Sequence, residues 1–371
     1  MNEPATAERP ADTGSAVGRS GAATAAVPTV TPATRPVRPP AMSDVAALAG
    51  VSHQTVSRVL NEHPSVREDT RRRVLDAIAT LGYRRNVAAR ALATARSATI
   101  GVVTTGSGLF GPASTLIAVE EAAREQGWYV SVATIRQYDG VTMHRVLDHF
   151  MDQAVEGIVV IAPQADVAEA VHEFRAPVPV VLIAAGETEA ATIPLAVDQR
   201  LGARLATEYL LDLGHESVLH VSGPGDWLDA VEREAGWRSV HEERGITPPD
   251  PVGADWTADR GYQVGLGLAD QIRTGEGPTA VFAANDHLAL GMLRAFWERG
   301  VSVPRDVSVV GFDDVAGSGH FVPPLTTVRQ PFDELGRRSV ALLLEAVAGA
   351  QVGAELIAPM LVERASAGPP P

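Results

Sequence analysis

The chain has 371 residues, a formal net charge of −14 and no cysteine. Apolar residues make up 45% of it, enough for a large core, and the length suits two or three domains of roughly 100 to 200 residues each. The lack of cysteine excludes disulfides and thiolate metal sites. No apolar run approaches the ~18 residues of a membrane span, so we expect no membrane partner.

Residues 1–40 consist largely of Ala, Pro, Thr and Gly with scattered charge. They contain no apolar stretch behind a basic start, which is against a secretory signal. Such a segment buries too little surface to offset the entropy of ordering it. We therefore expect a disordered N-terminal extension and a cytoplasmic protein.

The charge is distributed unevenly along the chain. Residues 41–98 contain nine Arg and five acidic residues, a balance of +4, and residues 1–40 have a balance of +1, which leaves −19 for the remainder. A short basic module on an acidic body is typical of a DNA-binding protein with a separate sensing domain. Small helical modules also carry such an excess by chance, so charge alone does not decide the function.

The region after the extension has the pattern of short helices. We expect helices over 43–49 and 53–60, where the Ser52 hydroxyl can accept a hydrogen bond from a first-turn amide of the second helix. A third helix is expected over about 67–81, with Gly82 as the left-handed residue that ends it. The apolar faces of the first and third helices are expected to consist of Val45, Ala46, Leu48, Ala49, Val74, Leu75, Ile78 and Leu81.

From Ala98 onward, apolar strands alternate with helices. Continuous apolar strands in this alternation predict parallel sheets that are covered on both faces. Two such sheets in sequence, with the chain crossing back near 324–332, indicate two lobes around a cleft, and ligands bind at the carboxyl ends of such strands. The expected strands are 98–105, 128–134, 157–163, 178–185, 217–224, 279–286 and 307–314.

Residues 44–61 read Asp-Val-Ala-Ala-Leu-Ala-Gly-Val-Ser-His-Gln-Thr-Val-Ser-Arg-Val-Leu-Asn and closely resemble the headpiece of the lactose-repressor (LacI/GalR) family. The resemblance covers about 42–365 and is closest to the lactose-repressor branch. It implies a transcription repressor whose affinity for a palindromic operator in double-stranded DNA is changed by a small effector, most often a sugar. Further matching segments are Thr70-Arg71, Leu81-Gly82-Tyr83, Asn86, 89–92, 157–160, 284–286, 309–314 and 323–330.

The resemblance also implies the architecture. It predicts a small all-α helix-turn-helix headpiece and an α/β, two-lobed, periplasmic-binding-protein-like effector domain. The expected parts are an extension at 1–40, the headpiece at 41–84, a hinge helix and linker at 85–97, the effector-binding and dimerisation domain at 98–366, and a short tail at 367–371.

The chain departs from the family pattern at several positions. Ala41 stands where the family has Thr or Ser capping the first helix, which predicts that the cap is supplied otherwise or is weaker by ~1 kcal/mol. Arg85 replaces the Pro that precedes the hinge Asn, which predicts a looser hinge with added charge for a phosphate. The chain ends within five residues of Ser366, without the leucine heptads that make some members tetramers, so a homodimer is expected.

A recognition helix in the major groove presents its first residues to base edges. In the second helix these are His53 and Gln54, with Arg58 one turn further; Gln pairs with adenine, and Arg with guanine. Hydroxyl groups at the same end are suited to phosphate contacts that fix the register on DNA. These hydroxyls belong to Ser52, Thr55 and Ser57, and the resemblance adds Asn61 and Tyr83 to the DNA-contacting set.

The segment from Asn86 to Ala95 resembles the hinge helix of the family. By this resemblance Asn86 and Ala89 contact DNA, and Leu92 is the apolar wedge that enters between base steps in the minor groove. A lone large apolar residue among alanines suits a wedge on a pair of closely packed helices. The alternative is that Leu92 packs onto the sensing domain.

A carbohydrate site combines an aromatic face with groups that bind adjacent hydroxyls, and the resemblance assigns this mixture to eight residues. Asp229 and Arg233, four residues apart on one helix face, would also fit an ordinary surface ion pair. Ala184 stands where sugar-responsive relatives have an acidic residue, and we hypothesise that Asp229 compensates for it. The expected site for a mono- or disaccharide comprises Leu109, Pro112, Asp229, Arg233, Trp256, Asn285, Asp313 and Phe332.

Two other classes of protein use a similar α/β domain. The segment Gly106-Ser-Gly-Leu-Phe-Gly111 suggests a nucleotide-binding enzyme, but the second strand lacks the acidic residue that binds the ribose hydroxyl. A periplasmic solute-binding protein would need a signal sequence and would not carry residues 41–97. Hydrolase motifs and metal-ligand spacings are also missing, so we expect no enzymatic activity, cofactor or metal.

Overall fold

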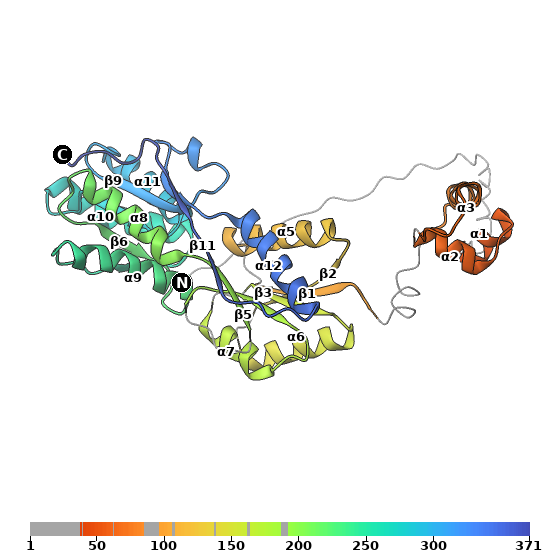
Figure 1. The fold of residues 1–371 in the computed structure, drawn as a ribbon. Helices are drawn as coiled ribbons and strands as arrows, with labels where there is room; N and C mark the ends of the chain where they lie inside the picture. Colours follow the sequence, from red (N-terminus) through yellow and green to blue (C-terminus); the bar gives the residue numbers. More distant parts are fainter. Residues whose placement is uncertain are drawn as a thin grey trace, which may run out of the picture. The chain divides into compact units, whose positions relative to one another are not determined.

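The computed structural model describes residues 38, 40–61, 63–84, 96–105, 108–136, 139–161, 164–186 and 192–371. The chain divides into two compact units, Met1–Arg85 and Asn86–Pro371 (Figure 1). The expected extension falls almost wholly outside the described residues, and so does most of the expected hinge, with Arg85, Asn86, Ala89 and Leu92. These expectations therefore stay predictions.

The headpiece consists of α1 (Met42–Ala49), α2 (His53–Leu60) and α3 (Glu68–Leu81), as the pattern predicts to within one residue at each end. Ser52 caps α2 by accepting a hydrogen bond from the Thr55 amide, and Gly82 ends α3 at φ 62°. Ala41 gives α1 no side-chain acceptor, but its own amide donates to Asp44 Oδ2 at 2.7 Å. Half of a capping box is thus present without a capping side chain.

Two expected core residues of the headpiece lie on its surface. Leu48 is 54% exposed and Leu75 is 51% exposed, because the contacts among the three helices cover a narrower stripe than the apolar pattern suggests. Tyr83, expected at the DNA, is instead 8% exposed and packs in the core, so its ring is a structural element of the headpiece. The core consists of Val45, Ala46, Ala49, Val56, Val59, Val74, Ala77 and Tyr83.

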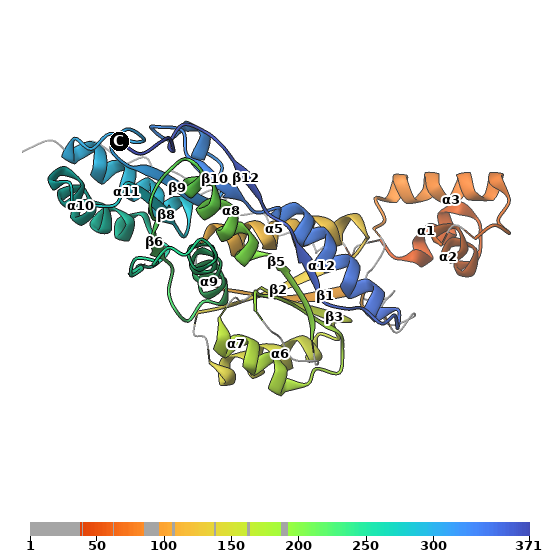
Figure 2. The ribbon, with the colours of Figure 1, turned by 60° about the vertical axis from the view of Figure 1, so that its left-hand side comes forward.

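The first lobe of the second unit is a parallel sheet covered on both faces. The strands run in the order β11-β5-β4-β3-β1-β2. Helices α5 and α12 cover one face, and α6 and α7 cover the other (Figure 2). The strands are β1 (Thr99–Thr105), β2 (Tyr129–Ile135), β3 (Gly157–Ile161), β4 (Val180–Ile183), β5 (Ile193–Val197) and β11 (Glu355–Ile357), and the helices are α5 (Phe110–Glu125), α6 (Gly140–Asp152), α7 (Ala165–Phe174) and α12 (Phe332–Val347).

The second lobe repeats this plan with strand order β12-β10-β9-β8-β6-β7. Helices α10 and α11 pack on one face of its sheet, and α8 and α9 pack on the other. The only antiparallel pairing among the described strands joins β10 to β12. The strands are β6 (Leu219–Ser222), β7 (Val252–Gly253), β8 (Ala280–Ala283), β9 (Ser308–Asp313), β10 (Thr326–Arg329) and β12 (Met360–Val362), and the helices are α8 (Gln199–Asp212), α9 (Leu228–Glu243), α10 (Ala258–Thr274) and α11 (Asp286–Arg299), with a 3-10 turn at Ser318–His320.

The chain passes between the two lobes three times: from β5 to α8, from β10 to α12, and from β11 to β12. All seven expected strands are present, and the expected return at 324–332 contains β10. The final residues pack on the second lobe, where the Gly368 amide donates to Ser308 Oγ and Ala367 joins the α8–α9 side of the core. Within the described part of the chain, no helix is long and apolar enough to span a membrane.

Candidate DNA-reading helix and interlobe cavity

Helix α2 presents three exposed side chains that have no competing partner. His53, Gln54 and Arg58 are all exposed, and no hydrogen bond or ion pair holds them to another described residue. Gln54 and Arg58 are four residues apart, so they lie on the same face of the helix. The buried Val56 and Val59 fix the opposite face to α1 and α3. This arrangement leaves an amide and a guanidinium free to meet base edges.

The small polar residues of α2 are already engaged locally. Ser52 Oγ lies 2.9 Å from Thr55 Oγ1 as well as capping the helix. Ser57 Oγ accepts a hydrogen bond of 3.5 Å from the Asn61 side-chain amide. Each hydroxyl therefore keeps at most part of its hydrogen-bonding capacity for a phosphate.

A cavity of about 650 Å³, including its mouth, lies between the two lobes, and we call it the interlobe cavity. It is formed at the carboxyl ends of strands of both sheets, where open α/β sheets bind ligands. All eight residues expected at the effector site line it, so Asp229 and Arg233 are not a surface pair. Its described lining also includes Phe110, Gly111, Thr115, Ile161, Ile183, Ala184, Ala185, Ala196, Val197, Gln199, Trp227, Gln330 and Leu335.

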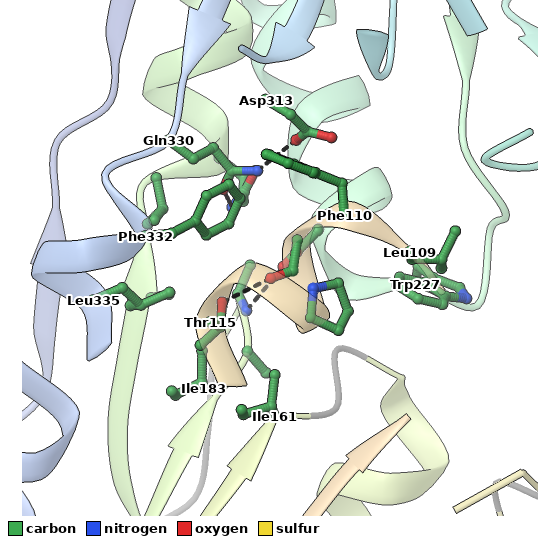
Figure 3. Close-up of a pocket in the computed structure, with 18 of the residues that line it drawn as sticks. Leu109, Phe110, Thr115, Ile161, Ile183, Trp227, Asp313, Gln330, Phe332 and Leu335 are labelled. Atoms are coloured by element: carbon green, nitrogen blue, oxygen red, sulfur yellow. Dashed lines mark hydrogen bonds between the residues drawn. The ribbon is translucent and has the colours of Figure 1, made fainter. Parts of the chain in front are cut away.

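A closed ring of side chains holds Arg233 and Asp313 in the cavity wall. Arg233 Nε donates to Gln199 Oε1 at 2.9 Å, and Gln199 Nε2 donates to Gln330 Oε1 at 2.8 Å. Gln330 Nε2 then donates to Asp313 Oδ1 at 2.7 Å (Figure 3). Arg233 Nη2 lies 3.7 Å from the same carboxylate oxygen and closes the ring. The four groups are buried, so each fixes the orientation of the next.

Neither Gln199 nor Gln330 was expected at the site from the sequence. Gln199 is the first residue of α8, directly after the first crossing between the lobes, and Gln330 follows β10 at the second crossing. The available signal was position, because both residues occupy the polypeptide links that border the cleft. A glutamine has no charge pattern or spacing that would single it out.

Trp256 and Asn285 are fixed by backbone contacts. Asn285 caps α11 by accepting from the Leu288 amide, and its Nδ2 donates to the Trp256 carbonyl at 3.1 Å. The Trp256 ring packs on Gly223, where an added Cβ would lie 2.3 Å from the ring. The Arg233 guanidinium carbon lies 5.4 Å from the Trp256 ring centroid. Trp256 is therefore a cavity wall with an aromatic face rather than a buried core residue alone.

Asp229 connects the two lobes at the cavity. It lies on α9 of the second lobe, and its Oδ1 accepts a hydrogen bond of 3.3 Å from the amide of Ala185 in the first lobe. Its neighbour Leu228 packs against the first-lobe core, and Trp227 forms an isolated antiparallel β-bridge with Gln164 of the first lobe. The carboxylate of Asp229 thus lies beside the strand end where Ala184 provides no acidic group.

Burial governs the ionisation of the charged groups in the cavity. Burial raises the pKa of Asp229 and of Asp313, and the positive charge of Arg233 opposes this rise in both. Burial lowers the pKa of the Arg233 guanidinium, while the negative charges of Asp313 and Asp229 raise it. The three groups therefore depend on one another for their charged states.

Asp286 and Asp314 have structural roles. Asp286 accepts hydrogen bonds from the Val315 amide and the Thr327 hydroxyl, and burial raises its pKa to about 8. Asp314 pairs with Arg329 and Arg364, both at 2.6 Å. No group of three or more His, Asp or Glu side chains in the described part of the chain could hold a metal ion.

Two family models match the chain. The model for bacterial regulatory proteins of the lacI family matches residues 41–86, and the model for periplasmic binding protein-like domains matches residues 207–367. The lactose operon repressor of Escherichia coli (strain K12) is 35% identical over 331 residues, which are 88% of this chain and 91% of that protein. The ribose operon repressor of the same strain is 32% identical and aligned over 88% of this chain and 99% of its own.

Solved structures agree with these matches. The crystal structure of the lac repressor dimer bound to operator and the anti-inducer ONPF has a TM-score of 0.80 and 34% identity, over 89% of this chain and 99% of that chain. A complex of the transcriptional regulator CelR with cellobiose has a TM-score of 0.65 and 31% identity, over 88% and 99% of the two chains. The chain belongs to the LacI family, and it is a helix-turn-helix transcription regulator with a periplasmic-binding-protein-like domain.

Proposed function

We propose that this protein represses carbohydrate-utilisation genes and is released from a palindromic operator by a small sugar. The interlobe cavity carries this proposal, because it combines a buried guanidinium, two carboxylates and an amide with the aromatic face of Trp256. Neutral polyols are bound by such planar, charged donors and acceptors, which meet adjacent hydroxyls. The relatives also support a sugar as the effector, because two of them are named as repressors of lactose and ribose operons and CelR was solved with cellobiose.

In the headpiece, Gln54 and Arg58 read base edges in the major groove, with His53 beside them. The hydroxyls of Ser52, Thr55 and Ser57 and the amide of Asn61 contact phosphates and fix the register. The hinge residues Asn86, Ala89 and Leu92, which lie outside the described part of the chain, complete the interface in the minor groove. Leu92 is the wedge in this proposal.

In the cavity, Asp229, Arg233, Asn285 and Asp313 bind hydroxyls of the effector. Arg233 Nη2 and the second oxygen of Asp313 make no hydrogen bond within the buried ring, and we assign them to hydroxyls of the effector. The aromatic wall is supplied by Trp256 and Phe332, and Leu109 and Pro112 close the apolar side.

The repressor acts as a homodimer in the cytoplasm. Two headpieces are needed for the two halves of a palindrome, and the lac repressor was solved as a dimer on its operator. A protein that regulates transcription works in the compartment that holds the chromosome. Effector binding changes the pose of the two lobes and weakens operator binding through a coupling of ~1–3 kcal/mol or more.

The test uses the full-length protein and fluorescent duplexes. Selection from random DNA identifies the bound palindrome, and anisotropy titrations then measure affinity with and without each member of a mono- and disaccharide panel. We expect at least one sugar to weaken operator binding by tenfold or more, with no effect on a scrambled duplex. Failure of every sugar to change the affinity would contradict the proposed effector class, and failure to select any palindrome would contradict the proposed DNA site.

A further inference from the structure

The amino ends of three neighbouring strands bring a cluster of residues together at the edge of the first-lobe sheet that lies away from the interlobe cavity. Ala98, Trp128 and Glu156 directly precede β1, β2 and β3, and these strands are adjacent in the sheet. The segment expected to form the hinge and linker, 85–97, ends at this cluster. The chain that comes from the headpiece therefore enters the effector domain here.

Glu156 binds two groups of the entering chain. Its Oε2 accepts a hydrogen bond from Arg96 Nε, and its Oε1 accepts one from the Ala98 amide, both at 2.7 Å. The guanidinium carbon of Arg96 lies 5.7 Å from the ring centroid of Trp128. The Glu156 side chain is only 16% exposed, and hydrogen bonds to a charged acceptor are strong. We call Arg96, Ala98 and Glu156 the linker clasp.

Ala98 has a strained backbone conformation. Its φ is 49°, in the left-handed region that residues with a Cβ disfavour. Both of its peptide groups are held, because its amide donates to Glu156 and its carbonyl accepts from the Tyr129 amide at 2.8 Å. A strained residue persists only where its surroundings enforce the conformation. The charged bond to Glu156 is one of the contacts that enforce it.

The backbone that presents Glu156 is itself fixed. The Glu156 amide donates to the Thr99 carbonyl at 2.9 Å. On one side, Val155 is 4% exposed and packs in the first-lobe core. On the other side, Gly157 packs so closely that an added Cβ would lie 2.8 Å from the Leu343 side chain. The carboxylate therefore acts from a rigid part of the lobe on the chain that enters it.

We infer that Glu156 is a positioning residue for operator binding: it holds Ala98 in the left-handed conformation and so sets the direction in which the chain leaves the first lobe toward the hinge. Without the carboxylate, Ala98 would relax toward an ordinary φ of about −60° or below. Such a rotation redirects every residue that precedes Ala98 in the chain. This inference rests on the proposed binding to a palindromic operator, and it does not involve the interlobe cavity.

Anisotropy titrations of the full-length protein test the inference on the selected palindrome and on a scrambled duplex. Glu156→Ala should weaken binding to the palindrome at least tenfold, because two hinges must leave their lobes in fixed directions to meet one operator. Binding to the scrambled duplex should stay within about twofold of the wild type. The control is Glu169→Ala on the exposed side of α7, which removes the same charge from the same lobe and should bind as the wild type.

The outcomes separate this inference from the proposed function. Wild-type affinity of Glu156→Ala for the palindrome would overturn the inference alone, and so would an equal loss on the two duplexes. Failure of the wild type to select any palindrome would overturn both the inference and the proposed function.

Two further variants distinguish the turn at Ala98 from the stability of the domain. Glu156→Gln keeps an acceptor for the Ala98 amide and should lose less than threefold in affinity for the palindrome. Adding Ala98→Gly to Glu156→Ala should restore affinity at least threefold, because glycine adopts the left-handed conformation without penalty. A domain that was merely destabilised would not be rescued by glycine. An equal loss in the Gln and Ala variants, or no recovery in the double variant, would overturn the inference.

Hydrogen exchange measures the clasp without DNA. In the full-length Glu156→Ala protein, the Ala98 amide should exchange at least tenfold faster than in the wild type, while the amides of α7 keep their wild-type rates. Glu156→Gln should give a smaller increase, because its side-chain oxygen still accepts from this amide. An unchanged rate at Ala98 in the alanine variant would show that Glu156 does not hold the turn, and the inference would be wrong.

Discussion

At the scale of single residues, Arg233 is the only cationic side chain among the described residues that line the interlobe cavity. The residue is 3% exposed, and its guanidinium donates to Gln199 and to the Ala284 carbonyl and faces the carboxylate of Asp313. It also lies 3.9 Å from the Phe312 ring centroid. Every neighbour in the ring of side chains depends on this one cation, directly or through a glutamine.

Replacing Arg233 with Gln should therefore affect both stability and ligand binding. We expect the free energy of unfolding to fall by about 3–5 kcal/mol, because Asp313 would be left buried without its cation. Urea denaturation measures this loss, and calorimetry should detect no effector binding. The control is Arg238→Gln on the same helix, whose exposed pair with Glu234 should contribute less than about 1 kcal/mol. Equal losses in the two variants would contradict the role assigned to Arg233.

His220 makes the stability of the second lobe sensitive to acid. Its ring is fully buried, stacks on Phe282 at 4.7 Å and leaves Nε2 without a hydrogen-bond partner. Burial lowers its pKa to about 3, whereas the unfolded chain has the ordinary value of about 6.5. Between these values the unfolded chain binds a proton that the native state does not, so the contribution of His220 lowers the stability as the pH falls, whereas the raised pKa of Asp286 contributes in the opposite direction.

Between pH 7 and pH 5, His220 should lower the free energy of unfolding by about 2 kcal/mol. The variant His220→Gln should lack this contribution. Urea denaturation at several pH values gives the slope of the free energy of unfolding against pH. This slope, not the absolute stability, is compared between the wild type and the variant. His215 and His241, whose pKa values burial also lowers, keep part of the slope in the variant. The matched control, His149→Gln on the exposed side of α6, should leave the slope as in the wild type. A variant with the wild-type slope would show that His220 does not titrate as described.

At the scale of elements, the start of α1 is under-capped. Ala41 has the extended backbone of an N-cap residue, φ −98° and ψ 164°, and its amide already donates to Asp44. A hydroxyl at this position could accept from the Asp44 amide and complete the capping box. The local backbone is therefore ready for a side chain that the sequence does not supply.

Ala41→Ser should stabilise α1 by about 1 kcal/mol. Hydrogen exchange of the amides in the first turn of α1, measured in the full-length protein, should slow by about fivefold. Ala79→Ser, at an exposed interior position of α3, is the control and should give no added protection. Unchanged exchange at Asp44 and Val45 in the Ala41 variant would contradict the under-capped description.

Exposed arginines on α2 and α3 allow the base reading that we propose for α2 to be tested separately from general attraction to DNA charge. Arg58 is exposed, so Arg58→Ala should leave the headpiece folded while weakening binding to the selected palindrome by about 1–3 kcal/mol. Anisotropy titration against matched and scrambled duplexes measures the effect. Arg72→Ala removes another exposed charge, on α3, and we expect a smaller loss that is similar on both duplexes. If the two variants lost the same affinity on both duplexes, Arg58 would supply charge only.

At the scale of the whole effector domain, the role proposed for Asp229 would join ligand binding to the contact between the lobes. The same carboxylate lines the cavity and accepts a hydrogen bond from the Ala185 amide of the other lobe. A ligand hydroxyl that engages Asp229 would compete with this bond or reinforce it. Either effect changes the free energy of the lobe arrangement, which is what an effector must do.

Asp229→Ala should weaken effector binding by about tenfold and reduce the effect of the effector on operator affinity, because both depend on the same carboxylate. Calorimetry and anisotropy measure the two quantities on one preparation. The control is Glu232→Ala on the same helix, which loses a pair with Arg200 within the second lobe and should leave both quantities unchanged. Unaltered effector affinity in the Asp229 variant would refute the role of this residue in compensating for Ala184.

The sequence by itself determined the headpiece and the alternation of strands and helices, because these depend on local spacing, caps and turn residues such as Ser52 and Gly82. It also indicated the eight residues that line the cavity, although through a family resemblance rather than through their spacing. Only the tertiary structure decided which apolar residues are buried: Leu48 and Leu75 fit the helical pattern but lie outside the packed stripe, and Tyr83 lies inside it.

Tertiary structure also decided how the cavity is organised. The ring from Arg233 through Gln199 and Gln330 to Asp313 joins residues up to 131 positions apart, and no local pattern encodes such a contact. The gathering of Asp229, Arg233, Asn285 and Asp313 in the described lining of the cavity arises in the same way, since these residues lie on elements that meet only in the folded chain. Local sequence patterns predict the elements of this regulator, and the packing of distant strand ends determines which side chains line its cavity.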